Sequence, residues 1–76
     1  MPLHLGPHRT QILRALDRPA NMRGLTAALN YTASALTYQC NRLVQAGLIQ
    51  RERRGREVMV SRTERGAALL DLLAGR

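Results

Sequence analysis

Lysine, phenylalanine and tryptophan are absent from this chain of 76 residues, and cysteine occurs only once. A chain of this length forms one small domain. Because aromatic residues make up only 3% of it, the core must be built from Leu, Ile, Val, Met and Ala. We expect a thin core of modest stability, which association with a second copy would reinforce.

Reactive groups are also scarce. The lone Cys40 excludes an intramolecular disulfide, and its place among apolar residues favours a small core residue over a redox-sensing thiol. His4 and His8 stand at helical spacing without a carboxylate or thiol companion, so we expect no metal site and no cofactor. No nucleophile has a base at a plausible spacing, and an enzyme is not expected. Without a long apolar run or a signal peptide, the chain is predicted to be soluble and cytoplasmic.

Positive charge is what the chain has in excess. All 12 basic residues are arginines, and they give a formal net charge of +7 at pH 7. The planar guanidinium suits phosphate and guanine, which makes this charge useful on DNA. A genome whose codon bias favours Arg over Lys would give the same composition. The placement of the arginines has to decide between the two interpretations.

Residues 32–46 have the pattern of an amphipathic helix with an unusual polar face. At about 100° per residue, one arc carries apolar side chains: Ala33, Leu36, Cys40, Leu43 and Val44. The opposite arc carries mostly hydroxyls and amides: Ser34, Thr37, Tyr38, Gln39, Asn41, Arg42 and Gln45. An ordinary surface helix carries long charged residues instead. Short polar groups can hydrogen-bond to base edges in a nucleic-acid groove, so we expect a recognition helix.

A short helix is predicted just before this one. Asn21 is a good N-cap, and the apolar stripe that follows consists of Met22, Leu25, Ala28 and Leu29. Asn30 tolerates the left-handed conformation that ends a helix, and Thr32 can cap the next one. Two helices separated so briefly must cross steeply, which predicts a helix-turn-helix over residues 21–46. Whether Tyr31 belongs to the core or to a contact surface stays open.

The N-terminal part is simpler. Residues 1–6 are expected to form a short arm, with Leu3 and Leu5 able to dock on the domain. Pro7 is well placed at the start of a first helix. The buried stripe of this helix consists of Ile12, Leu13 and Leu16. The segment that ends the helix is Asp17, Arg18 and Pro19.

Residues 48–62 are predicted to form a β-hairpin, because short polar-apolar segments flank Arg54 and Gly55. A two- or four-residue loop would place Ile49 opposite Val60 and gather the apolar side chains on one face. The same register places Arg51 opposite Val58, and Glu52 unfavourably opposite Glu57.

A three-residue loop is the alternative. It would pair Arg53 with Glu57, but it would also place Ile49 against Ser61. We prefer the first register, because burial of the apolar face outweighs an exposed repulsion.

A last helix is predicted over residues 63–74, with Thr63 as its cap. Leu69, Leu70 and Leu73 share one face, while Leu72 points elsewhere. Leu72 is therefore the best candidate for a subunit contact, with Leu69 and Leu73 beside it. A single exposed leucine at a frayed end is the competing interpretation.

This order of elements resembles the winged helix-turn-helix domains of bacterial transcription regulators. The segments that carry the likeness are Leu25 to Leu29, TASALTYQCNRLVQAGLIQRE and GREVMVSRTERG. They look most like the MarR group and its short relatives, and they are also similar to the ArsR group. The resemblance implies a mainly α fold with a small β-hairpin, an α+β class. It implies one domain over residues 1–76, ordered helix, helix, helix, strand, strand, helix.

The resemblance implies a small transcriptional regulator that binds double-stranded DNA in a sequence-specific manner. We expect a repressor associated with the nucleoid, acting as a homodimer on an inverted repeat. The chain lacks the additional helices of the MarR dimer and effector pocket, so no small-molecule effector is expected. It also lacks the ArsR cysteine and histidine clusters, so metal sensing is not expected. The alternative is a winged-helix protein-interaction module, which would need an apolar patch on the long helix.

The predicted DNA contacts divide between helix and hairpin. Ser34, Thr37 and Tyr38 lie in the N-terminal half of the helix, which usually meets base edges. Asn41 could read adenine, Arg42 could hold a phosphate, and the cap Thr32 could donate to another. The wing is the hairpin over residues 48–62, and its arginines are expected on the backbone or in the minor groove: Arg51, Arg53, Arg54 and Arg56. A solvated hairpin protected by its charge from aggregation is the competing interpretation.

Overall fold

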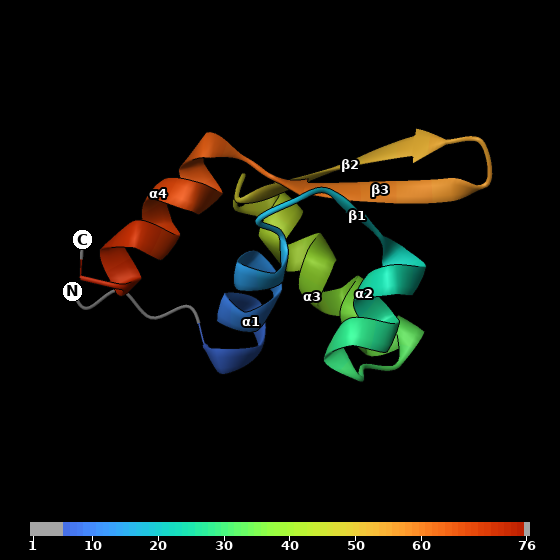
Figure 1. Cartoon of the computed structure of the whole chain (residues 1–76), viewed down its shortest axis with the longest axis horizontal. Helices are drawn as coiled ribbons and strands as arrows, with labels where there is room; N and C mark the ends of the chain where they lie inside the picture. Colours follow the sequence, from blue (N-terminus) through green and yellow to red (C-terminus); the bar gives the residue numbers. More distant parts are fainter. Residues whose placement is uncertain (1–5, 76) are drawn as a thin grey trace.

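The computed structural model describes residues 6–75, which form helices packed beside a small antiparallel sheet (Figure 1). The elements are α1 (Pro7–Ala15), β1 (Ala20–Asn21), α2 (Met22–Leu29), α3 (Ala33–Gln45), β2 (Ile49–Arg54), β3 (Glu57–Arg62) and α4 (Glu64–Leu73). The predicted mainly helical winged-helix fold is confirmed. The proposed docking of Leu3 and Leu5, and the position of His4, lie outside the described residues.

The sheet has three strands, where the sequence predicted two. Its order is β1-β3-β2 and all pairings are antiparallel. Ala20 pairs with Val60 and Asn21 with Met59. A strand of two residues has no alternating pattern to detect, and it forms because the chain between α1 and α2 passes along the free edge of β3.

Three side-chain caps fix the helix starts as predicted. Oδ1 of Asn21 accepts from the backbone N–H of Gly24 at 2.6 Å. The hydroxyl oxygens of Thr32 and Thr63 accept from the N–H groups of Ala35 and Gly66 at 3.1 and 3.0 Å. Asn30, with φ of 56°, supplies the left-handed residue that ends α2. The turn between α2 and α3 is therefore built from local capping chemistry.

The core draws on every helix except α4, whose leucines pack at its edge. Its buried apolar residues are Ile12, Leu13, Leu16, Leu25, Leu36, Cys40, Leu43, Leu48, Ile49 and Val60. Two residues placed on predicted apolar stripes are exposed instead, Ala28 and Ala33. Ala28 lies beside the stripe of Met22, Leu25 and Leu29 rather than on it. Ala33 begins α3, before that helix passes over the core.

The hairpin register differs by two residues from the predicted one. Ile49 pairs with Arg62 and Arg51 with Val60, so the predicted pairing of Ile49 with Val60 is wrong. An even shift leaves every side chain on its original face, and Ile49 and Val60 are both still buried. Apolar burial alone therefore could not distinguish these two registers.

Charge and turn geometry favour the observed register. It moves Glu52 away from Glu57 and places it opposite Met59, while Glu57 faces Arg54. The loop begins at Gly55, whose φ of 61° suits the first central position of a two-residue type II′ turn. The unfavourable acidic pair of the predicted register is thus avoided without loss of buried surface.

Helix α4 is fastened to the base of the hairpin. The N–H of Thr63 donates to the carbonyl oxygen of Leu48 at 3.1 Å, and its hydroxyl donates to that of Gly47 at 2.7 Å. Arg62 donates from Nη1 to the carbonyl oxygen of Leu13 at 2.9 Å, which ties β3 to α1. These bonds set the hairpin at a fixed angle to the helices, with α4 beside α1 and the wing extending the other way (Figure 1).

Candidate nucleic-acid interface

The polar face of α3 is exposed to solvent except at Gln39. Its exposed side chains include all the predicted contact residues of this element: Thr32, Ser34, Thr37, Tyr38, Asn41 and Arg42. Tyr38 exposes 58% of its surface, although it is large and partly apolar. On the other side, Leu36, Cys40 and Leu43 are buried. The structure therefore brings the predicted helix residues together on one accessible surface.

Gln39 is the exception on the predicted polar arc. It is half-buried, and its Oε1 accepts from Nε of Arg9 at 3.2 Å. This amide joins α3 to α1, so Gln39 serves the packing of the helix rather than its open face. The distinction depends on the position of α1, which the periodicity of α3 alone does not contain.

Tyr31 belongs to the packing between the turn and α1. It is half-buried against the core, and its hydroxyl donates to Oε1 of Gln11 at 3.1 Å. The same hydroxyl lies 2.8 Å from Nδ1 of His8, and the two rings meet edge to face. These contacts hold the start of α3 against α1, so the reading face has a fixed orientation.

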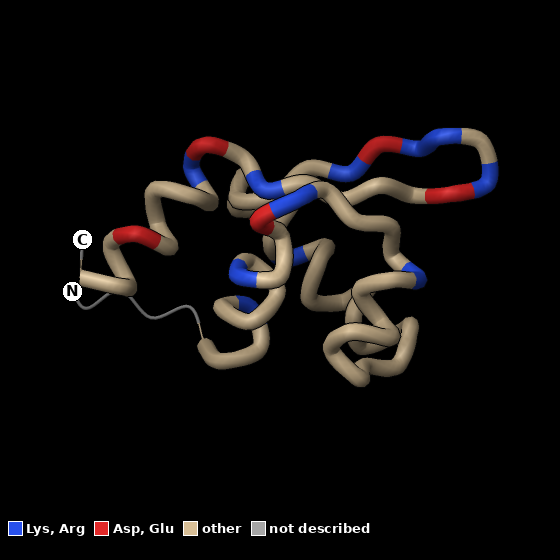
Figure 2. The backbone as a smooth tube through the Cα atoms, viewed as in Figure 1, with Lys and Arg blue, Asp and Glu red and all other residues tan. Residues whose placement is uncertain are grey.

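The wing carries exposed arginines on both faces and at its tip. Arg51 and Arg53 lie on the face that also carries Ile49, while Arg54 lies on the other face and Arg56 in the loop. Figure 2 shows basic and acidic residues alternating along β2, with further charge at the tip. The four predicted wing arginines are therefore distributed around the hairpin rather than aligned on one side.

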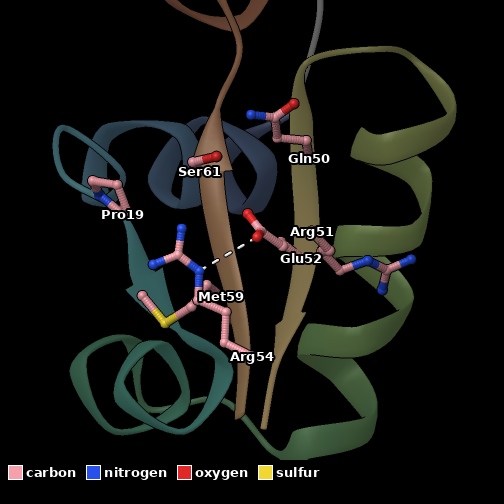
Figure 3. A pocket seen from close by; sticks show the side chains of 7 residues that line it. All are labelled: Pro19, Gln50, Arg51, Glu52, Arg54, Met59 and Ser61. Atoms are coloured by element: carbon pink, nitrogen blue, oxygen red, sulfur yellow. Dashed lines mark ion pairs between the residues drawn. The ribbon is translucent and has the colours of Figure 1, made fainter.

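Figure 3 shows the outer face of the sheet beside Pro19. Nε of Arg54 lies 3.4 Å from Oε1 of Glu52 in an exposed ion pair. Arg51 extends to the opposite side, toward α3. Arg54 is thus paired with a carboxylate of its own strand, Glu52, whereas Arg51 points toward the recognition helix.

Cys40 is buried in α3 and forms no disulfide. Burial raises the pKa of its thiol, and the positive charge of Arg51 opposes this shift in part. A protonated, enclosed thiol is a packing group, as the sequence predicts. Within residues 6–75, no three His, Cys, Asp or Glu side chains are grouped so that they could hold a metal ion.

The leucines proposed for subunit contact differ in exposure. Leu72 exposes 60% of its surface, whereas Leu69 and Leu73 are half-buried. Leu69 and Leu72 line a largely apolar hollow with Ala46, Leu48, Arg65 and Ala68. The hollow lies where α4 passes the end of α3, far from the wing tip.

The sequence model of the MarR family matches residues 5–57. The chain belongs to the MarR family. No curated protein sequence matched it.

Solved structures of MarR-type proteins superpose on nearly the whole chain. A mutant MarR from Escherichia coli in complex with operator DNA gives a TM-score of 0.88 at 26% identity, covering 93% of this chain and 54% of its own. The transcriptional regulator BldR from Sulfolobus solfataricus gives 0.84 at 30% identity, covering 90% of this chain and 52% of its own. The chain thus spans about half the length of these proteins.

The chain therefore has the winged-helix DNA-binding fold of MarR-family transcription regulators. Regulators of this family are DNA-binding proteins rather than enzymes. Among the helices of residues 6–75, none is long and apolar enough to span a membrane.

One exposed arginine near this surface was missing from the predicted contacts. Arg23 lies in the first turn of α2, a turn without an acidic residue. The positive end of the helix dipole makes this position unfavourable for a cation. A basic residue in the first turn of the helix that precedes the recognition helix is the sequence signal by which Arg23 could have been predicted as a contact.

Proposed function

We propose that the chain is a sequence-specific DNA-binding module of a transcription regulator. The recognition helix α3 enters the major groove, and the wing rests on the backbone or in the adjacent minor groove. The observation that carries this proposal is the open face of α3, built from hydroxyls, amides and Arg42. Support comes from the superposed Escherichia coli MarR mutant, whose structure is a complex with operator DNA.

The residues of α3 take different roles in this arrangement. Ser34, Thr37 and Tyr38, near the start of the helix, face base edges. Asn41 can pair in bidentate fashion with adenine, and Arg42 holds a phosphate further along. Thr32 uses its oxygen to cap the helix, and its hydroxyl hydrogen is available to a phosphate.

The wing arginines supply sequence-independent attraction. Arg51, Arg53, Arg54 and Arg56 are exposed, and a guanidinium that replaces a counterion at a phosphate strengthens binding to any duplex. A narrow minor groove attracts an arginine further, because its negative potential is enhanced. The helix then supplies discrimination and the wing supplies affinity.

The proposed mode of regulation is occupation of the operator by the bound protein. A protein bound at an operator excludes the transcription machinery from the overlapping DNA, so the proposed role is repression. A homodimer on an inverted repeat, with half-sites about one helical turn apart, would double the reading surface. The proposed setting is the nucleoid in the cytoplasm, and no small-molecule effector is part of the proposal.

Selection of bound duplexes from a random pool tests this function. The wild-type chain should enrich one sequence, and Tyr38→Ala or Asn41→Ala should change the preference at one or two base pairs. Each lost base contact should cost about 1–3 kcal/mol of discrimination. Arg14→Ala is the matched control, since this exposed residue lies on α1, outside the proposed interface.

The selection has two informative failures. If the wild-type chain enriches no sequence, the sequence-specific function is wrong. If it enriches a sequence that both variants prefer equally strongly, then binding is specific but the open face of α3 is not what reads it.

A further inference from the structure

Arg23 lies between the recognition helix and the wing. It lines one hollow together with Leu36 and Thr37 of α3. It lines a second hollow together with Arg56 and Val58, at the loop and start of β3. A single exposed guanidinium on α2 thus borders both parts of the proposed DNA-binding surface.

Duplex geometry determines what must pass through this position. The major and minor grooves of B-DNA are separated by one sugar–phosphate strand. If α3 occupies the major groove and the wing reaches the adjacent minor groove, this strand must cross between the two elements. The residue that borders both hollows then faces the backbone rather than base edges.

The local polar groups leave Arg23 available for an anion. Oδ1 of Asn21 already accepts from the N–H of Gly24, and its Nδ2 donates to Oε1 of Glu57 at 3.4 Å. Glu57 lines the same hollow as Arg23 and Arg56, and its carboxylate is engaged by Asn21. Within residues 6–75, the one ion pair joins Arg54 to Glu52, so Arg23 has no carboxylate partner there.

We infer that Arg23, with Arg56 across the second hollow, binds the phosphate strand that separates the two grooves. This assignment rests on the proposed DNA binding and adds a contact from α2, outside both the recognition helix and the wing. Two guanidiniums on opposite sides of the strand fix the angle between wing and duplex. Arg23 is thus a positioning residue that sets the register of α3 without reading a base itself.

The salt dependence of binding tests the charge. Titrations of a random-sequence duplex should give Arg23→Ala a roughly tenfold lower affinity than wild type at low salt, and a slope of log K against log salt reduced by about one. Arg23→Lys should recover the slope because it keeps the charge. Arg14→Ala removes the same charge from α1 and should change neither quantity.

Neutral phosphates test the position. Single methylphosphonates are placed along the duplex recovered by selection, and wild-type affinity should fall most at one backbone position between the two groove contacts. Arg23→Ala should be insensitive to the methylphosphonate at that position and should respond as wild type does elsewhere. Circular dichroism of each variant confirms that the fold is intact, as expected for an exposed side chain.

The outcomes separate two failures. If the wild-type chain binds duplex DNA without salt dependence, or not at all, then the proposed function fails. If wild type binds with a steep slope and Arg23→Ala keeps both that slope and its sensitivity at every methylphosphonate, then the function stands and the assignment of Arg23 is wrong.

Discussion

Gly66 lies where the first turn of α4 passes the backbone of Leu48. A Cβ atom at this position would overlap the carbonyl oxygen of Leu48, which already accepts from the N–H of Thr63. Neither atom belongs to a flexible side chain, so backbone would have to move. At the residue scale, the glycine three positions after the Thr63 cap is therefore a steric requirement, because only glycine lets α4 pack this closely against the base of the hairpin.

Gly66→Ala should lower the free energy of unfolding by about 2 kcal/mol, the usual cost of overpacking a closely packed site. Urea denaturation of both proteins measures the difference. The sign is decisive, because helix propensity alone would make alanine the more stable residue by up to about 1 kcal/mol. A stabilised variant would show that α4 does not approach Leu48 this closely.

Cys40 should make the fold sensitive to alkali. Burial raises the pKa of this thiol in the folded chain, so the unfolded chain loses its proton first as the pH rises. The contribution to stability is complete below the ordinary thiol pKa of 9.0 and is lost as the pH climbs through the higher folded pKa.

Urea denaturation between about pH 7 and pH 10 should show wild-type stability declining above the ordinary thiol pKa. Cys40→Ala should be less stable throughout, because it leaves a cavity, but its profile should be flatter. Parallel profiles for the two proteins would mean that the thiol is not protected by burial.

At the scale of elements, the sequence specifies what depends on local chemistry. Helix caps such as Asn21 and Thr32, and the apolar stripe of α3, could be predicted because each involves neighbours along the chain. Strand β1 could not, since Ala20 and Asn21 form it only through pairing with β3. The observed hairpin register was not predicted for a different reason. It buries the same face as the predicted register, and only exposed charges and the turn distinguish the two.

The residues of the candidate site also divide into those that a local sequence pattern predicts and those whose role depends on tertiary structure. The open face of α3 follows from periodicity, and every predicted contact on it is exposed. The packing roles of Gln39 and Tyr31 depend on α1, and the position of Arg23 depends on two elements distant in sequence. Such placements come from tertiary structure, which no local pattern contains.

The wing gives the prediction that belongs to this scale. Arg54→Ala and Arg56→Ala should each weaken binding to all duplex sequences and flatten its salt dependence, because they remove phosphate contacts. Glu52→Gln should strengthen binding, since it releases Arg54 from its ion pair and removes a negative charge. Titration by fluorescence anisotropy at several salt concentrations measures all three.

The control for these wing variants is Glu64→Gln, an exposed acid in the first turn of α4. It changes the net charge as Glu52→Gln does, outside the wing. If both glutamine variants raise affinity equally, the effect is one of total charge, and the ion pair on the wing has no special role.

At the scale of the whole molecule, the chain is elongated, with principal extents of 39, 22 and 19 Å. The wing and the C-terminal end of α4, the helix that carries the exposed Leu72, lie toward opposite ends of it (Figure 1). This separation would let a second copy bind along α4 while both recognition surfaces stay open. The hollow beside Leu72 is apolar, and a leucine exposed at its rim is suited to that contact.

Sedimentation equilibrium should therefore detect a homodimer, with two chains bound per inverted repeat. Leu72→Glu should shift the free protein toward monomer, because a carboxylate placed in an apolar contact loses its hydration. Leu72→Met keeps the contact apolar and should remain dimeric. A wild-type chain that is monomeric at high concentration, both free and on DNA, would contradict this arrangement.

Titration of a random-sequence duplex with the wild-type chain at two salt concentrations tests DNA binding most directly. The exposed arginines predict binding that weakens steeply with salt, with log K falling by about 0.9 per phosphate contact for each unit of log salt. Binding that is absent, or equally strong at both concentrations, would contradict the account.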